Sequence, residues 1–171
     1  MGTLLNRVAV PEGVTLRSAE GPEKTIIEGV SPPSSNAVRG VYLARDARLS
    51  GFTVRGAGTR DFLQDCYQAQ SGGGVFCEDG AVVENCIVVS NRAHAYAGGI
   101  HGGTASNTVI AANTALRGGG VAFTALDRCV VTRNHAHHIG GGVYRSTLQR
   151  STVTHNRSSY SSGGTFESDA E

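Results

Sequence analysis

Apolar residues in this chain occur in short runs, and the pattern of the runs repeats at a nearly constant interval. Each run spans three to five residues, is rich in Val, Ile and Thr, and ends at Gly or Asn. Apolar and polar positions alternate within the runs, which is the period of a half-buried β-strand. No stretch shows the longer amphipathic period of a helix. The pattern therefore predicts an all-β chain built from many short strands.

Two motifs carry the repeat. One is Gly-Gly followed by an aliphatic residue, and it begins at Gly73, Gly98, Gly119 and Gly141. The other places an aliphatic residue three positions before an Asn, at intervals of 22, 21 and 22 residues: Val88/Asn91, Ile110/Asn113, Val131/Asn134 and Val153/Asn156. Two motifs that keep the same period through four units indicate a repeat architecture.

Less regular units precede these four. An upstream unit fits at an offset of 34 residues, which aligns Val41 with Val75. Still earlier, Val14–Leu16 and Ile26–Ile27 are predicted strands of one irregular unit, with a turn at Gly21–Pro22.

A unit of about 22 residues with such short strands cannot bury its own apolar face, so successive units must stack. Stacking makes their strands parallel and in register, and parallel crossovers are right-handed in nearly all proteins. The sequence thus predicts a single-stranded right-handed parallel β-helix, a solenoid of about six to seven coils of roughly 22 residues. One domain covers residues 1–171, with an irregular first coil at 1–40, repeat coils at 41–166, an excursion at 60–72 and a polar tail at 167–171.

The Asn residues of the repeat are expected at the corners of the coils. Asn and Gly tolerate left-handed backbone angles, so we expect them to make the turns themselves. Asn side chains at the same place in successive coils are also expected to hydrogen-bond along the stack as a ladder. This predicts a structural role for the Asn column, which consists of Asn91, Asn113, Asn134 and Asn156.

The composition narrows the class of protein further. Gly supplies 24 of the 171 residues, aromatic residues make up 6%, and the formal net charge is +1. So small a net charge gives no reason to expect a nucleic-acid partner or a membrane surface. No apolar run is long enough for a spanning helix, and Leu4-Leu5 is too short for the core of a signal peptide.

At this point the residues resemble a known group of proteins. The aliphatic-x-x-Asn and Gly-Gly-(Ile/Val) motifs are similar to the repeats of polymorphic outer-membrane-type surface proteins. More broadly they resemble pectin-lyase-like β-helices of secreted and surface bacterial proteins, and residues 10–29 resemble the first coil of such proteins. The likeness covers about residues 8–166. It implies the β-helix fold and an extracellular or cell-surface location, and it leaves the activity open because this fold hosts lyases, hydrolases, adhesins and spacers.

The cysteines indicate packing rather than chemistry. Cys86 and Cys129 share a column but lie two coils apart, roughly 9.6 Å, which is too far for a disulfide. We interpret both as small buried fillers. Cys66 and Cys77 could pair with each other or with Cys86, and the irregular spacing leaves their disulfide state open.

Six histidines raise the question of a metal site, chiefly in the turn His135-Ala-His137-His138. His94 matches His137 in its own unit, but Leu116 occupies the coil between them. A site would need a third ligand of convergent geometry, so no metal is predicted here.

Arginine supplies 14 of the 15 basic residues. Arg92, His135 and Arg157 fall in one turn column, and Arg128 and Arg150 are neighbours in another. Guanidinium groups suit the carboxylate or sulfate groups of a polyanionic sugar chain. A solvated face would give the same pattern, and that interpretation is favoured here.

An outward column follows the Gly pairs and contains most of the ring-bearing side chains. Such rings could stack on sugar faces, bury against a partner, or simply shield the strand. Its members are Tyr42, Phe76, His101, Ala122, Tyr144 and Phe166, of which Tyr42, Phe76, His101 and Tyr144 are the candidate ligand-binding residues.

The candidate catalytic residues form one acidic group with a nearby arginine. β-Helix polysaccharide lyases need acidic residues for a cation or substrate carboxylate and an Arg or Lys base, while glycoside hydrolysis needs paired carboxylates. No lyase or hydrolase signature is present, and Ca²⁺ would be implied only for a lyase; otherwise no cofactor is expected. The weak candidates are Asp65, Glu78, Asp79, Glu84 and Arg45.

Taken together, these features favour an extracellular or cell-surface β-helix scaffold that recognises a glycan or a surface protein through one stacked face. The alternative is a polysaccharide lyase or glycoside hydrolase acting on acidic polysaccharide, and a third is a spacer within a larger surface protein. Open ends of a β-helix expose sheet edges, so we expect the chain to be part of a longer solenoid or to self-associate.

Overall fold

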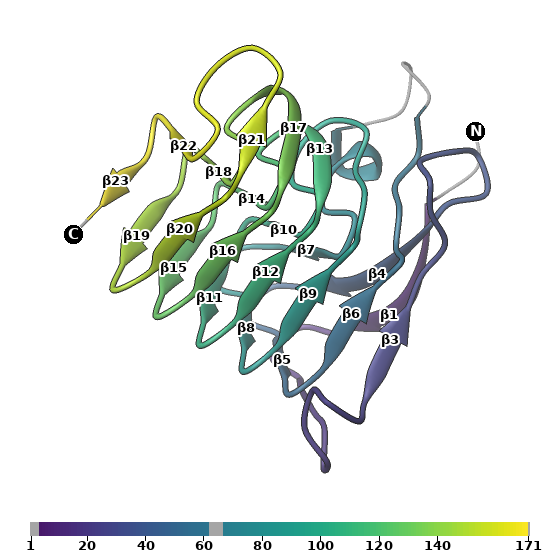
Figure 1. The fold of residues 1–171 in the computed structure, drawn as a ribbon. Helices are drawn as coiled ribbons and strands as arrows, with labels where there is room; N and C mark the ends of the chain where they lie inside the picture. Colours follow the sequence, from purple (N-terminus) through teal and green to yellow (C-terminus); the bar gives the residue numbers. More distant parts are fainter. Residues whose placement is uncertain (1–3, 62–66, 171) are drawn as a thin grey trace.

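The computed structural model describes residues 4–61 and 67–170, which form parallel β-sheets of short strands (Figure 1). The first sheet contains β1 (Leu5–Val10), β4 (Val38–Leu43), β7 (Val75–Cys77), β10 (Ile100–His101), β14 (Val121–Ala122), β18 (Val143–Tyr144) and β22 (Thr165–Phe166). The second contains β2 (Thr15–Arg17), β5 (Arg48–Ser50), β8 (Val82–Glu84), β11 (Thr104–Ser106), β15 (Ala125–Asp127), β19 (Thr147–Gln149) and β23 (Asp169–Ala170). The prediction of an all-β chain is confirmed.

Two further sheets complete the architecture. The third sheet contains β3 (Ile26–Glu28), β6 (Thr53–Arg55), β9 (Ile87–Val89), β12 (Val109–Ala111), β16 (Val130–Thr132) and β20 (Thr152–Thr154). A shorter fourth sheet contains β13 (Thr114–Arg117), β17 (His135–Ile139) and β21 (Arg157–Ser158). A 3₁₀ turn, η1 (Tyr67–Gln70), precedes β7.

The chain visits the sheets in a fixed order, and we call one passage through the first, second and third sheets a circuit. Each strand therefore pairs in parallel with the equivalent strand of the next circuit, and the stack grows from the N-terminal to the C-terminal end (Figure 1). The pairing has the predicted register: Val41 lies opposite Val75, and Val88 lies opposite Ile110. The predicted early strands also fit, because Leu16 pairs with Leu49 and Ile27 with Val54.

The core lies between the sheets and consists of the central residue of most strands. Val88, Ile110 and Val131, which follow one another in the third sheet, are each 0% exposed. Their neighbours in the same strands point outward and are partly exposed, as strand alternation requires. The inward column of one circuit thus packs on the next, and the core is continuous along the stack.

The Asn ladder predicted from the repeat is present; Asn91, Asn113 and Asn134 are fully buried, and Asn156 is half-buried. The Asn113 Oδ1 accepts hydrogen bonds from the backbone N–H of Asn91 at 2.9 Å and from its Nδ2 at 3.1 Å. Asn113 makes the same two bonds to Asn134, at 2.9 and 3.0 Å, and Asn134 makes them to Asn156, at 2.8 and 3.0 Å. Each Nδ2 also donates to a backbone carbonyl of the preceding circuit, as from Asn113 to Val88 at 2.9 Å. The ladder therefore satisfies polar groups that stacking would otherwise bury unpaired.

The Gly-Gly motif and the Asn motif lie against each other in the stack. A Cβ atom on Gly99 would lie 2.6 Å from the carbonyl oxygen of Gly120 and 3.0 Å from the Asn113 amide nitrogen. Gly120 has the same relation to Gly142 and Asn134, at 2.6 and 2.9 Å. These distances exclude a side chain, so the two motifs repeat together because each circuit's glycine backbone lies against an Asn amide.

The left-handed backbone angle falls one residue earlier than predicted. The residues with positive φ are those immediately before the ladder: Ser90 at 57°, Ala112 at 53°, Arg133 at 56° and His155 at 56°. The prediction that the Asn residues themselves turn left-handed is wrong. An Asn must point into the stack to bond its neighbours, so the preceding residue takes the strained angle and points outward.

No helix among residues 4–61 and 67–170 is long and apolar enough to cross a membrane.

Candidate functional site

A pocket of about 490 Å³ opens on the outer side of the first sheet, near its pairing of β7 with β10. The wall combines charged groups, ring faces and backbone. Its members are Arg45, Gln68, Phe76, Cys77, Glu78, Asp79, His101, Gly102, Gly103 and Phe123. Three of the predicted catalytic candidates therefore meet two of the predicted ligand-binding residues.

Strand pairing brings the charged groups together. Leu43 at the end of β4 lies opposite Cys77 at the end of β7, so the residues that follow each strand meet in adjacent circuits. Beyond the strands, the Arg45 backbone N–H donates to Glu78 Oε2 at 3.1 Å. The Tyr42 hydroxyl donates to the other carboxylate oxygen of Glu78. That hydrogen bond raises the pKa of Tyr42 above its ordinary value, with smaller contributions from burial and the charge of Glu78.

His101 forms the inner wall of the pocket as a neutral imidazole. Its ring stacks on Phe76, with centroids 4.9 Å apart and planes 4° from parallel, and its Nε2 lies 2.5 Å from the Tyr67 hydroxyl. Burial, helped by the charge of Arg39, lowers the pKa of His101 to about 4. Its Nδ1 is buried and has no hydrogen-bond partner among the residues that the structure describes. A neutral ring with one unsatisfied nitrogen can accept or donate one further hydrogen bond, according to its tautomer.

The sulfur at the pocket is not a nucleophile. Cys77 is a free cysteine, and burial raises the pKa of its thiol to about 12. A thiolate is therefore not available near neutral pH. Cys86 and Cys129 are likewise free and buried, and burial raises the pKa of both thiols.

The predicted aromatic column exists, but a second layer covers much of it. Tyr42 stacks on Phe76 with centroids 6.1 Å apart, and Tyr144 stacks on Phe166 at 5.7 Å. Phe76, His101 and Tyr144 are nevertheless only 5–7% exposed. Most of the column is therefore a second apolar layer outside the core rather than an open face.

Three rings from outside the column form the cover. Tyr96 lies 5.6 Å from Tyr144, and Tyr67 lies 5.1 Å from Tyr96. Phe123, with φ of 57°, lies 5.4 Å from His101 and 5.6 Å from Tyr144. Those two residues flank Ala122 in the column, so Phe123 fills the space that the small side chain leaves.

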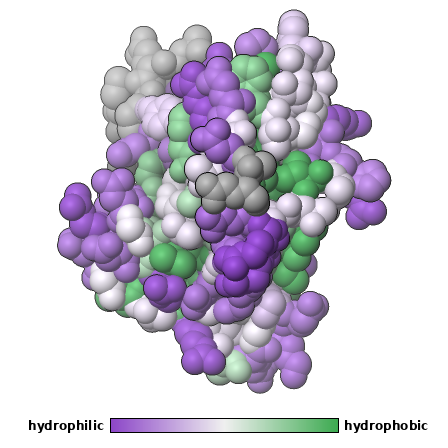
Figure 2. Space-filling view, turned by 90° about the vertical axis from the view of Figure 1, so that its left-hand side faces the viewer, coloured by the Kyte–Doolittle hydropathy of each residue, from purple (hydrophilic) through white to green (hydrophobic). Residues whose placement is uncertain are grey.

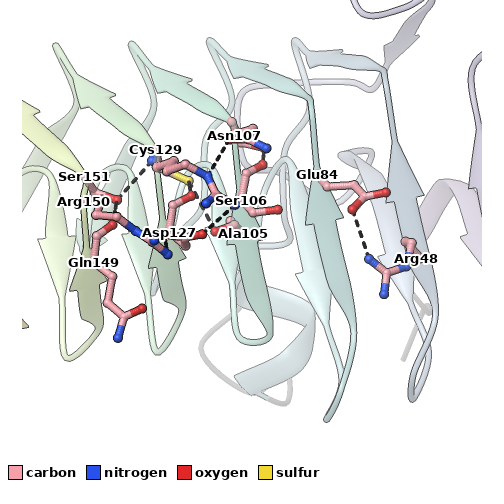
Figure 3. Close-up of polar contacts among 12 residues, drawn as sticks. Arg48, Glu84, Ala105, Ser106, Asn107, Asp127, Cys129, Gln149, Arg150 and Ser151 are labelled. Carbon is pink, nitrogen blue, oxygen red and sulfur yellow. Dashed lines mark hydrogen bonds and ion pairs between the residues drawn. The ribbon is translucent and has the colours of Figure 1, made fainter.

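The remaining catalytic candidates are not part of this pocket. Glu84 forms an ion pair with Arg48 at 3.1 Å on the second sheet and does not line the pocket (Figure 3). Asp65 lies outside the described residues, as does Cys66. The structure therefore brings together Arg45, Glu78 and Asp79 from the predicted acidic group.

The column that contains Cys86 and Cys129 lies away from the pocket, and besides packing it accepts hydrogen bonds. The sequence analysis did not predict these hydrogen bonds. The Cys86 backbone N–H donates to Thr108 Oγ1 at 3.3 Å. The Cys129 backbone N–H likewise donates to Ser151 Oγ at 3.0 Å (Figure 3). These small side chains form a second ladder of corner hydrogen bonds. Its signal in the sequence was the restriction to Cys, Thr and Ser at this position.

Sequence reasoning missed Tyr67, Tyr96 and Phe123. Tyr67 lies outside the repeat, in the turn η1. Tyr96 and Phe123 hold stacked positions whose residue type changes between circuits, since Tyr96 lies opposite Arg117 and Phe123 holds the same left-handed corner as Arg145. The repeat of residue types therefore gave no signal for the three rings. Within the described residues no group of three or more His, Cys, Asp or Glu side chains could hold a metal ion.

Comparisons with known proteins add no relative. No protein-family model, no curated protein and no solved structure matches the chain.

Proposed function

We propose that the stacked circuits form a right-handed parallel β-helix of the pectin-lyase-like type, with about six to seven coils. The fixed order in which the chain visits its parallel sheets supports this, since a β-helix is the arrangement that repeats such an order. The right hand follows from the general preference of parallel crossovers. The resemblance of the repeats to those of secreted and surface proteins supports an extracellular or cell-surface location.

On this fold the chain is a rigid scaffold that binds a glycan at the pocket of the first sheet. The observation that carries the proposal is the composition of the pocket wall: the rings of Phe76 and Phe123 beside the charged groups of Arg45, Glu78 and Asp79. Sugar rings present C–H faces that pack on aromatic rings and hydroxyls that bond to carboxylate and guanidinium groups. The side chains of Arg45 and Asp79 are exposed, so a ligand can reach them.

A binding screen over neutral and acidic oligosaccharides tests this function. The wild-type chain should bind one class, and Arg45→Gln with Asp79→Asn should weaken that binding at least about tenfold, because each loses a charged hydrogen bond. Arg17→Gln with Glu23→Gln is the matched control, since it removes the same charges from exposed positions in the first circuit. Absence of binding to every class, or equal loss in the control, would contradict the proposal.

The residues of the same pocket also support a second candidate function, that of an enzyme. Glu78 and Asp79 place two carboxylates beside Arg45, the residue types that a polysaccharide lyase or glycoside hydrolase acting on acidic polysaccharide would use. In the lyase case the carboxylates would hold Ca²⁺. New reducing ends or unsaturated uronide products that vanish in Asp79→Asn would replace the scaffold by this function.

We also propose that the chain associates with a partner protein or with another copy of itself. The exposed apolar residues at the ends of the described stack support this. Leu5 and Ile26, on the outer strands of the first circuit, are 66% and 45% exposed. The view onto the last circuits shows hydrophobic side chains between hydrophilic ones (Figure 2). Outer strands offer unpaired backbone groups to a further strand. Sedimentation that stays monomeric at high concentration would rule out self-association.

A further inference from the structure

The later circuits of this chain carry a net positive charge, because nearly all of its carboxylates lie elsewhere. Residues 85–166 contain seven of the 14 arginines and all six histidines, with Asp127 as their single carboxylate. That carboxylate is already engaged, because Asp127 pairs with Arg128 at 2.9 Å and with Arg150 at 2.6 Å (Figure 3). The small net charge of the whole chain therefore hides a strongly positive half.

Six of these side chains lie on one stretch of surface, which we call the cationic ridge. Strand pairing places His135 opposite Arg157, and Thr114 between His135 and Arg92. Arg133 and His155 hold equivalent positions one residue before the Asn ladder. The ridge consists of Arg92, Arg133, His135, His137, His155 and Arg157.

The backbone holds the ridge in a fixed geometry. Ala136 points into the core, so His135 and His137 on either side of it both point outward, with ring centroids 4.8 Å apart. Asn134 and Asn156 are joined by the ladder, which fixes the spacing of the residues that flank them at about the 4.8 Å of neighbouring strands. The ridge residues thus follow the stack in two rows: one contains Arg92, His135 and Arg157 and is interrupted by Thr114, and the other contains Arg133 and His155.

Nothing in the described part of the chain neutralises these charges. Arg92, Arg133, His137, His155 and Arg157 are exposed, and none forms an ion pair with a described carboxylate. Burial lowers the pKa of His135, with smaller contributions from the neighbouring His137 and Arg157. An unpaired row of like charges is unfavourable unless solvent or an anionic ligand compensates it.

We infer that the cationic ridge is a binding site for a linear sulfated polysaccharide, distinct from the pocket of the first sheet and independent of the function proposed there. Guanidinium groups pair with sulfate oxygens through two parallel hydrogen bonds. A straight ridge fits an extended chain that presents its anions along one side. Positive charge in several circuits would engage successive sulfate groups.

Nucleic acid fits the ridge less well. Duplex recognition uses a helix or ribbon that enters a groove, and the flat strands of the fourth sheet provide neither. Single strands are bound on aromatic platforms, and the six ridge residues include no Phe, Tyr or Trp. A sulfated polysaccharide needs only the rows of cations that are present.

Among the described residues, the surroundings of His135 contain no acidic group. The groups that face it are His137 on its own strand, Arg157 on β21, Thr114 on β13, and the Ser159 hydroxyl at 3.4 Å. No carboxylate among these groups competes with an anionic ligand at this part of the ridge.

Heparin, as a sulfated probe, tests the proposal with a matched pair of variants. We expect Arg133→Gln with Arg157→Gln to weaken heparin binding roughly tenfold, since two exposed charge contacts are lost. Arg128→Gln with Arg150→Gln should change it less than about twofold, because those arginines are already paired with Asp127. Arg128, Arg133 and Arg150 all hold left-handed corners, so the two double variants are comparable in fold.

Two outcomes would contradict the proposal. Equal loss of binding in the two arginine double variants would overturn the site. Tighter binding to single-stranded or duplex DNA than to heparin at the same salt concentration would overturn the sulfated polysaccharide as its ligand. Arg17→Gln with Glu23→Gln, at exposed positions of the first circuit, should leave heparin binding unchanged, so a loss of binding in the ridge variant is specific to the ridge.

Discussion

The first and fourth sheets use their outward positions in opposite ways, although both stand on the same stacked backbone. On the first sheet the outward rings of Phe76, His101 and Tyr144 are covered by further rings and become a second apolar layer. On the fourth sheet the outward side chains, such as His137 and Arg157, stay exposed. The repeat thus fixes where outward residues lie, whereas rings that do not recur from circuit to circuit decide whether those residues are covered.

Both sheets depend on the stacked backbone that the Asn ladder holds together. Of the changes considered, Asn113→Ala should therefore lower the free energy of unfolding most. The change leaves the Val88 carbonyl and the Asn91 amide groups buried without partners. We expect a loss of more than about 3 kcal/mol in the free energy of unfolding, measured by urea titration. Asn107→Gly, at an exposed left-handed corner, is the control and should cost less than about 1 kcal/mol. Similar losses in both variants would contradict a special role for the ladder.

Burial of His101 predicts that acid destabilises the covered face. Because its pKa is about 4 in the folded chain and about 6.5 when unfolded, the unfolded state binds the proton first. Stability should therefore fall as the pH drops from about 6.5 to 4, by up to about 3 kcal/mol from this residue. His101→Phe, which keeps the stack on Phe76, should remove this part of the slope in urea titrations at stepwise pH. An unchanged slope would show that His101 is not held neutral.

Removal of a ring that covers the first sheet should lower the free energy of unfolding by an intermediate amount. Phe123→Ala removes the ring that fills the space beside Ala122, and because Phe123 is 39% exposed we expect a loss of about 1–2 kcal/mol. The variant should also bind a hydrophobic dye that the wild type does not bind. Tyr160→Ala, at an 80% exposed position, should do neither. If Phe123→Ala behaved like Tyr160→Ala in thermal unfolding, the second layer would not contribute to stability.

The smallest effect should come from the ion pair on the second sheet. Arg48 and Glu84 are 42% and 29% exposed, so water screens their attraction. Glu84→Gln should cost less than about 1 kcal/mol and leave glycan binding at the pocket unchanged. A large loss of glycan binding in this variant would show that Glu84 belongs to the functional site.

Most of the backbone could be predicted from the sequence because the repeat of residue types follows from the packing of one circuit on the next. A position such as Ile110 is apolar in every circuit since it must pack on Val88 and Val131, so period and register follow from the pattern. The cover over the first sheet could not be predicted, because the aromatic residue type of Tyr67, Tyr96 and Phe123 does not recur at the equivalent positions of other circuits. The corner angle was misplaced for a related reason: the pattern marks which residue must be Asn, whereas the residue before it carries the strain without a fixed identity.

The contrast between a covered and an open face can be measured directly by modification of histidines with diethyl pyrocarbonate, followed by mass spectrometry at neutral pH. In the folded chain His137 and His155 should react rapidly, while His101 should stay protected until the protein unfolds. In the Phe123→Ala variant, the modification of His101 should accelerate and that of His137 should not. Reaction of His101 at the rate of His137 in the native wild-type chain would contradict the account.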